Sequence, residues 1–320
     1  MLRKLPPAGV TRGSRLREFR TVASFMAPVW LGLLIFFGYP LVATIWFSLN
    51  KFDLFSAPRW FGLGNFAYML QDADLHRAAA NTLWLVVVLV PVKVVAALAV
   101  ALLLAKLRRS ASFWRTVFYL PALIPPVAAT VAFVFLFNPG TGAVNTVLGW
   151  VGIEGPLWFN DPYLAKPSLV LLAVWGLGDW MIILLAAVLD VPRERYEAAE
   201  LDGAGAFARL RHVTLPGIAP VLMFSALVGV IQTLQFFTQA AVAGSVASGK
   251  ATVGQGRGAA FGYPDGSTTT FPMWLYEVGF GHYTLGYASA LALVLFAFSL
   301  LFTVLLLRRF KSYVADGSVQ

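Results

Sequence analysis

Residues 21–50 read TVASFMAPVWLGLLIFFGYPLVATIWFSLN, a stretch without a single Lys, Arg, Asp or Glu. Residues 116–153 form a second uncharged tract, and each is long enough to cross a ~30 Å hydrocarbon core, which takes about 20 helical residues. The whole chain is 59% hydrophobic and 12% charged, about half the charged fraction of a typical soluble domain. It has no cysteine, which excludes disulfides and thiolate chemistry. The composition therefore predicts an all-α integral membrane protein.

Apolar runs between islands of charge predict six transmembrane helices. We expect these helices near residues 25–49, 80–105, 114–137, 167–189, 218–242 and 283–307. Six spans put both termini on one side of the membrane, and the short loops on the cytoplasmic side carry the excess of Lys and Arg. On the side of the termini fall 17 basic residues, against 6 on the other side, while Lys93 lies within a span. Both termini are therefore predicted to be cytoplasmic, and the net charge of +9 indicates topology rather than a nucleic-acid partner.

The predicted organisation has three parts. A basic cytoplasmic segment covers residues 1–24, the membrane domain covers 25–307, and a cytoplasmic tail covers 308–320. The first apolar tract is too long for a signal peptide and is expected to stay as a membrane helix. Between later spans, residues 190–217 form a cytoplasmic loop. Residues 243–282 form an outward loop, and its Gly-, Ser- and Thr-rich part, 244–270, is predicted to be flexible.

The cytoplasmic loop has an unusual pattern for a connector, since residues 190–216 read DVPRERYEAAELDGAGAFARLRHVTLP. Pro192 can begin a helix, Pro216 is expected to interrupt one, and Asp202-Gly203 is a turn signal, so two short helices with a bend are predicted. Apolar residues at three- to four-residue steps give this pair one apolar face. That face comprises Tyr196, Ala199, Phe207, Leu210 and Val213. On a solvent-exposed loop, such a face predicts a protein partner.

This loop resembles the hallmark of the permease subunits of binding-protein-dependent ABC importers, because Glu197-Ala198-Ala199, Gly203 and Leu215-Pro216 match the family's spacing. The resemblance implies a type I importer permease fold in which the loop is a coupling helix that docks on a separate ATPase. Glu197 would supply the charged contact and Gly203 the bend. The other residues assigned to this contact are Ala198, Ala199, Asp202, Phe207, Leu210, Val213, Leu215 and Pro216. Leu210 departs from the pattern, since related loops often carry Phe there. The alternative is a helical hairpin that only joins two spans.

Shorter motifs resemble the sugar-transporting branch of the family, which includes the maltose and glycerol-3-phosphate importer permeases. These motifs are Tyr39-Pro40 with Ser48, Gly62-Leu63-Gly64-Asn65-Phe66, Ser267-Thr268-Thr269-Thr270 and Gly286-Tyr287-Ala288-Ser289-Ala290. The resemblance implies a multi-pass protein in the lipid of a prokaryotic cytoplasmic membrane, working by alternating access. Its expected partners are a second homologous permease, two ATPase subunits that hold ATP and Mg, and an extracytoplasmic solute-binding protein. The chain itself is expected to bind no cofactor or metal and to catalyse no reaction.

Polar groups inside the membrane are the candidates for the solute pathway. Lys93 and Asp179 lie where a charge costs at least ~2.5 kcal/mol, and they sit at similar depths, so an ion pair, a place in the pathway and no direct relation all remain open. Small and polar residues also recur on one face of the fifth predicted span, with Phe236 beside them. They are Ser225, Gly229, Gln232, Gln235 and Gln239. Amides next to an aromatic ring suit a hydroxyl-rich solute, although hydrogen bonding between permease subunits is an alternative.

Trp175 and Trp180 are weaker candidates, because tryptophan also marks membrane interfaces. We therefore predict a permease for a sugar, a polyol or a sugar phosphate. An ABC permease for an amino acid, phosphate or a metal is the alternative, followed by an ATP-independent channel or carrier. A membrane enzyme is disfavoured, since the intramembrane charges form neither an acid pair nor a triad.

Overall fold

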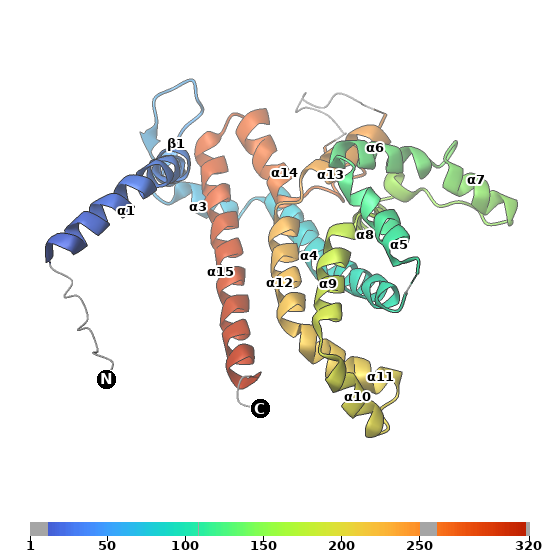
Figure 1. Cartoon of the computed structure of the whole chain (residues 1–320). Coiled ribbons are helices and arrows are strands. Elements are labelled where there is room, and N and C mark those ends of the chain that lie inside the picture. The colour runs from blue at the N-terminus through green and yellow to red at the C-terminus, as the bar shows by residue number, and fades with distance from the viewer. Residues whose placement is uncertain (1–11, 108, 250–260, 318–320) are drawn as a thin grey trace, which may run out of the picture.

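The computed structural model describes residues 12–107, 109–249 and 261–317, and within them the chain is predominantly helical, which confirms the all-α prediction. The strands described are β1 (Asn50–Lys51) and β2 (Arg59–Trp60), which pair antiparallel with Asn50 opposite Trp60. The short helix α3 (Gly64–Met69) follows them. These pieces form a small cap at one end of the helical bundle (Figure 1).

Within the described residues, four helices are long and apolar enough to cross a membrane, and the number rises to six if each of two bent pairs is one span. The four are Arg20–Ser48, Ala73–Ala105, Ala206–Leu234 and Leu285–Arg308. The first consists of α1 (Arg12–Leu33), the π-helical segment η1 (Leu34–Gly38) and α2 (Tyr39–Ser48). The second is α4 (Ala73–Ala105), and the last belongs to α15 (Leu285–Gly317). The predicted six spans are thus reached when each bent pair counts as one crossing.

The third and fourth predicted spans are broken rather than straight. In the third, α5 (Ala111–Tyr119) and the 3-10 turn η2 (Leu120–Leu123) meet α6 (Pro126–Leu136) at 98°. Pro125 and Pro126 lack backbone N–H groups and push the preceding residue out of the helical region, and Ile124 has ψ 130. In the fourth, α8 (Ala165–Trp175) and α9 (Gly178–Asp190) meet at 52°. Between them, α7 (Ala143–Trp150) and η3 (Trp158–Asn160) form an arm that projects from the bundle (Figure 1).

The fifth predicted span, 218–242, begins earlier and stops sooner than expected. After α10 (Arg193–Leu201), one helix runs through α11 (Ala206–Arg209), η4 (Leu210–Thr214) and α12 (Leu215–Leu234). The expectation that Pro216 interrupts a helix is wrong, because the helix continues past it. The π-helical turn η4 lies directly before α12 and is closed by the Leu215 N–H, which donates to the Leu210 carbonyl. Pro216 then lies in the first turn of α12, where a missing N–H is tolerated. The helix ends at Leu234, and α13 (Thr238–Ala247) follows a short break.

The outward loop predicted at 243–282 is largely ordered structure. Helix α13 reaches Ala247, and α14 (Phe271–Tyr276) and η5 (Glu277–Gly281) follow; residues 250–260 lie outside the described residues. Thr268 and Thr270 are buried, so this part of the loop packs against the bundle, while its predicted flexibility stays a prediction. The predicted terminal segments also contain helix, since α1 begins at Arg12 and α15 continues to Gly317, while 1–11 and 318–320 lie outside the described residues.

Helix α4 lies at the centre of the bundle, where it packs against α8, α9 and α12, and α15 packs against α2 and α12. Met181 and Leu184 of α9 are fully buried in this core. The α10–α11 hairpin lies at one end of the bundle, and the cap with β1 lies at the opposite end (Figure 1). Helix α1 stands away from the bundle (Figure 1), and its exposed apolar side chains, such as Phe25 and Trp30, require lipid or another subunit as a partner.

Candidate functional site

A cavity of about 440 Å³ lies where the helix breaks meet. Its walls come from α4, from residues 121–130 around the first break, from both sides of the α8–α9 break, and from both sides of the α12–α13 break. The volume falls in the range of roughly 300–1,000 Å³ typical of small-molecule sites. Interrupted helices free backbone N–H and C=O groups, which at membrane depth are tolerated where they are buried in protein or line a cavity. The three breaks therefore mark this cavity as the candidate functional site.

The cavity wall combines amides and hydroxyls with aromatic rings. Five of the six predicted pathway residues line it: Lys93, Gln232, Gln235, Phe236 and Gln239. The sixth, Asp179, is not among the lining residues. Trp175 and Trp180, which the sequence marked only weakly, line it as well. Lining residues that the sequence reasoning missed include Thr130, Thr233, Phe237 and Thr238, and the proline pair 125–126 was the signal that could have exposed the break beside Thr130.

The prediction that the polar stripe lies on one face of a single continuous helix is wrong. Gln235 and Phe236 lie in the break after α12, while Gln239 belongs to α13, so the chain bends around the cavity and brings the three glutamines together. Ser225 is buried and is not among the lining residues. Gly229 is required for packing, because a Cβ there would overlap the indole ring of Trp180.

Lys93 and Asp179 form an ion pair, with Lys93 Nζ 3.5 Å from Asp179 Oδ1. The same ammonium lies 4.6 Å from the centre of the Trp180 ring, a cation–π distance. The lysine side chain is 12% exposed and that of the aspartate 46%. Of the alternatives left open by the sequence, the ion pair is confirmed, and Lys93 is in addition part of the cavity wall.

The predicted loop of two short helices with a bend is also present. Gly203 has φ +79, and the N–H groups of Gly203 and Ala204 bond to the carbonyls of Glu200 and Ala199, at 3.0 and 2.8 Å. This arrangement is a Schellman motif, which ends α10 and favours glycine at the left-handed position. An ion pair between Arg209 and Glu200 braces α11 against α10.

The five apolar residues predicted to share one face of this loop are divided between two. Tyr196 and Val213 turn inward and pack beside Val188, Val191 and Ile218, and the Tyr196 hydroxyl lies 3.0 Å from Thr214 Oγ1. Phe207 points outward with 74% of its surface exposed, as does Leu201, at 90%. Leu201 was missed, although an apolar residue directly before the turn signal could have suggested it. Of the other residues assigned to ATPase contact, Glu197, Ala198, Asp202, Gly203 and Pro216 are exposed, and Ala199, Leu210 and Leu215 are half-buried.

Two of the shorter motifs, 62–66 and 286–290, contribute to the cap at the end of the bundle opposite the α10–α11 hairpin. The Asn65 side chain donates to the carbonyls of Ser48 and Asn50, at 2.8 and 3.0 Å. The Gly286 N–H donates to the Phe52 carbonyl at 3.0 Å, and a Cβ at Gly286 would overlap the Asn50 carbonyl, so glycine is needed there. These motif residues are therefore accounted for by the structure of the cap.

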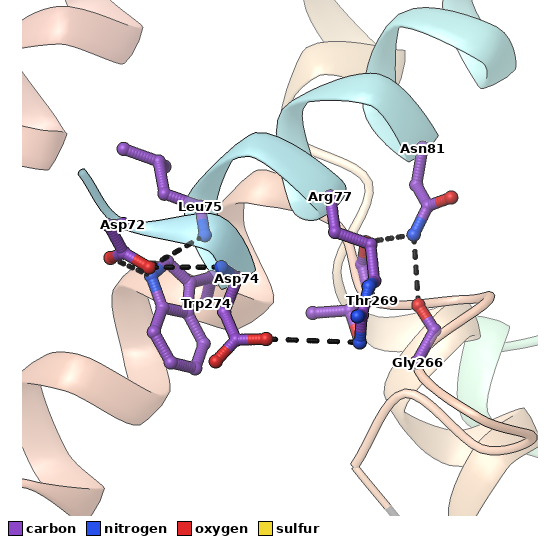
Figure 2. A network of polar contacts seen from close by, with 8 residues as sticks. All are labelled: Asp72, Asp74, Leu75, Arg77, Asn81, Gly266, Thr269 and Trp274. Carbon is purple, nitrogen blue, oxygen red and sulfur yellow. Dashed lines mark hydrogen bonds and ion pairs between the residues drawn. The ribbon is translucent and has the colours of Figure 1, made fainter. Parts of the chain in front are cut away.

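Asp72 joins the start of α4 to two later helices, α14 through Trp274 (Figure 2) and α15 through Tyr287. One carboxylate oxygen accepts from the N–H groups of Asp74 and Leu75 and caps α4, while the other accepts from Trp274 Nε1 at 2.9 Å and from the Tyr287 hydroxyl at 2.6 Å. Burial raises the pKa of Asp72, but the four hydrogen bonds together outweigh it, so the pKa lies below its ordinary value.

A second polar cluster ties residues 261–270 to the bundle. The Asn81 amide donates to the carbonyls of Gly266 and Thr269, at 2.9 and 3.0 Å (Figure 2), and its oxygen accepts from Lys166 Nζ at 2.9 Å. Thr270 Oγ1 donates to the Phe236 carbonyl at 2.7 Å, in the α12–α13 break. This segment is thus bonded directly to the backbone of the cavity wall.

Long apolar helices, a polar cavity at their breaks and an exposed helical hairpin define a membrane-embedded transport subunit. Within the described residues, no group of three His, Cys, Asp or Glu side chains could hold a metal ion. Residues 93–311 match the family described as binding-protein-dependent transport system inner membrane component. The chain belongs to this family, and it is a permease subunit of an ABC transporter.

Relatives agree with this assignment, and a solved structure shares the fold. The chain is 31% identical over 294 residues to the probable ABC transporter permease protein YesP of Bacillus subtilis, covering 91% of this chain and 90% of the relative. It is 30% identical over 302 residues to the sulfoquinovosyl glycerol transport system permease protein SmoG of Agrobacterium fabrum, covering 93% and 92%. A solved bacterial ABC transporter involved in the import of the acidic polysaccharide alginate has the same fold, with a TM-score of 0.77, 20% identity and coverage of 93% and 97%.

Proposed function

We propose that this subunit forms the translocation pathway of an importer for a sugar or a related hydroxyl-rich solute. The observation that carries the proposal is the cavity wall, where three glutamine amides stand beside Trp175, Trp180 and Phe236. Amides donate to and accept from hydroxyls, and aromatic rings pack on the apolar C–H faces of sugar rings. Relatives named for lactose, arabinooligosaccharide and diacetylchitobiose transport support the same solute class.

The complete importer in this proposal comprises this subunit, a second homologous permease, two ATPase subunits with ATP and Mg, and an extracytoplasmic binding protein. The α10–α11 hairpin docks on an ATPase through Glu197 and the exposed side chains of Leu201 and Phe207. The protein crosses the cytoplasmic membrane of a prokaryote six times, with both termini and the hairpin in the cytoplasm, as the distribution of basic residues indicates. The chain itself performs no chemistry and binds no cofactor.

The first experiment is co-purification of the tagged subunit from its native membrane, followed by mass spectrometry of its partners. An ATPase, a second permease and a binding protein are expected. The complex is then placed in liposomes with the binding protein, and ATP hydrolysis is measured with lactose, trehalose, diacetylchitobiose, glycerol 3-phosphate, an amino acid mixture and inorganic phosphate. Stimulation by a carbohydrate supports the proposal. Stimulation by amino acids or inorganic phosphate alone favours the other solute classes, and a homo-oligomer without an ATPase would overturn the proposal.

The coupling role is tested by a matched glycine pair within the loop. Gly203 has φ +79, whereas Gly205 has φ −69, and neither has another group within 4 Å of an added Cβ. Gly203→Ala therefore adds only backbone strain, of roughly 1–2 kcal/mol, and Gly205→Ala adds almost none. We expect ATP-driven uptake to fall about fivefold or more in Gly203→Ala, to stay normal in Gly205→Ala, and to be lost in Glu197→Lys, with the subunit present in the membrane in each case. Normal uptake in both Gly203→Ala and Glu197→Lys would remove the case for coupling through this loop.

A further inference from the structure

Lys93 is the charged residue among those that line the described cavity. Its counter-charge, Asp179, pairs with it from outside the set of lining residues, and the contacting oxygen, Oδ1, is buried. The ion pair thus presents its positive end to the cavity while the two charges sum to zero. A solute in the cavity meets an ammonium group that is already neutralised.

The ammonium of Lys93 has hydrogen-bonding capacity to spare. An ammonium group has three N–H donors, and among the described residues its polar contact is the ion pair with Asp179. Its contacts are the 3.5 Å approach to Asp179 and the 4.6 Å approach to the Trp180 ring. A hydroxyl oxygen of a solute lying against Trp180 could therefore accept a hydrogen bond from Lys93 without displacing Asp179.

Charge balance then separates neutral from acidic solutes. A carboxylate, sulfonate or phosphate in the cavity would add a negative charge that no remaining positive group on the described wall offsets, and an uncompensated charge away from water is costly. An uncharged, hydroxyl-rich solute carries no such cost. We propose that the Lys93–Asp179 pair makes this cavity selective for uncharged carbohydrates over acidic ones, with Asp179 as the residue that determines the selectivity. This inference rests on the proposed function, since it assumes that the cavity holds the solute.

The test uses the purified importer complex without its binding protein, so that only the membrane cavity selects. The probes are methyl β-D-glucoside and methyl β-D-glucuronide, which differ by a carboxylate in place of a hydroxymethyl group, together with maltose as a larger neutral sugar. Saturation-transfer NMR measures the affinity of each. The wild-type complex is expected to bind the glucoside at least about tenfold more tightly than the glucuronide. One neighbouring charge shifts an ionisation equilibrium by a factor of about ten or more, and we expect the uncompensated carboxylate to change the affinity by at least that factor.

Asp179→Asn leaves Lys93 without its counter-charge, so the glucuronide should gain at least about tenfold in affinity and the preference should shrink or reverse. The double variant Lys93→Gln with Asp179→Asn removes both charges and should restore discrimination against the glucuronide, which also covers the case in which the single variant folds poorly. Asp190→Asn, an exposed carboxylate at the end of the same helix, serves as the matched control and should behave as wild type.

The outcomes separate the two proposals. Equal or tighter binding of the glucuronide by the wild type, or an unchanged ratio in Asp179→Asn, would overturn the charge-selectivity inference while leaving a sugar cavity in place. No saturation transfer to the glucoside, maltose or the glucuronide in any variant would overturn the sugar pathway and this inference with it.

Discussion

At the scale of single residues, Lys93 and Asp179 illustrate how a membrane protein holds charge. The sequence placed both inside spans at similar depths, and the structure brings them within 3.5 Å. Trp180 then covers the ammonium with its ring. A pair of this kind costs far less than either charge would cost alone in the membrane.

A double-mutant cycle tests the pair. Asp179→Asn leaves the nearly buried ammonium unpaired and should destabilise the complex by about 2–3 kcal/mol, while Lys93→Met leaves a half-exposed carboxylate and should cost less. The double variant should be more stable than the sum of the single losses implies by at least about 1 kcal/mol. Thermal unfolding of the purified complex in detergent provides the measurement. Strictly additive losses would show that the two side chains do not stabilise each other.

At the scale of elements, the decisive features are the three helix breaks around the cavity. Prolines and glycines at 125–126, 176 and 178 mark two of them in the sequence, whereas the break at Gln235 has no such marker. The break at Gln235 is stabilised by a residue from another part of the chain. Thr270 Oγ1 donates to the Phe236 carbonyl, which the interrupted helix leaves free.

Thr270→Val should therefore loosen this break. The change keeps the side-chain shape but leaves a buried carbonyl without its partner, at a cost of about 1–3 kcal/mol. We expect faster amide hydrogen exchange at 237–239 and a lower unfolding temperature of the complex. Thr303→Val is the control, since the Thr303 hydroxyl donates to the Ser299 carbonyl of its own helix. Equal protection at 237–239 in wild type and Thr270→Val would contradict the role given to this hydrogen bond.

At the scale of the whole molecule, Asp72 links parts of the chain that are far apart in sequence. It caps α4 and accepts a hydrogen bond from Trp274 of α14 (Figure 2) and another from Tyr287 of α15, so one carboxylate links three helices at the end of the bundle that carries the cap. Because those hydrogen bonds favour the ionised form, the pKa of Asp72 is lower in the folded protein than in the unfolded chain.

The sign of the pH dependence follows from this lowered pKa. The stabilisation by Asp72 is fully present above its unfolded pKa of about 3.9 and is lost as the pH falls through the lower folded value. Unfolding temperatures measured from pH 7 to pH 3 should fall more steeply in wild type than in Asp72→Asn, which should be less stable at pH 7. Asp74→Asn is the control, since its ion pair with Arg77 is 59% exposed on both sides and contributes little. A parallel pH dependence in wild type and Asp72→Asn would remove Asp72 as the acid-sensitive link.

The sequence by itself determined that this protein lies in a lipid membrane, that it is helical and that its loop is bent, because these features depend on composition and on short-range rules. Uncharged runs of bilayer length require helices, and a glycine after Asp202 permits the left-handed turn wherever the loop lies. The tertiary structure alone decided that the α12 helix stops at Leu234, that Tyr196 turns inward while Leu201 points out, and that five pathway candidates share one cavity. Each of these depends on a partner distant in the chain, such as Thr270 for Phe236 or Ile218 for the packing around Tyr196. Local pattern carries no information about such partners, since the free energy that selects them comes from packing and hydrogen bonds formed only when the helices assemble.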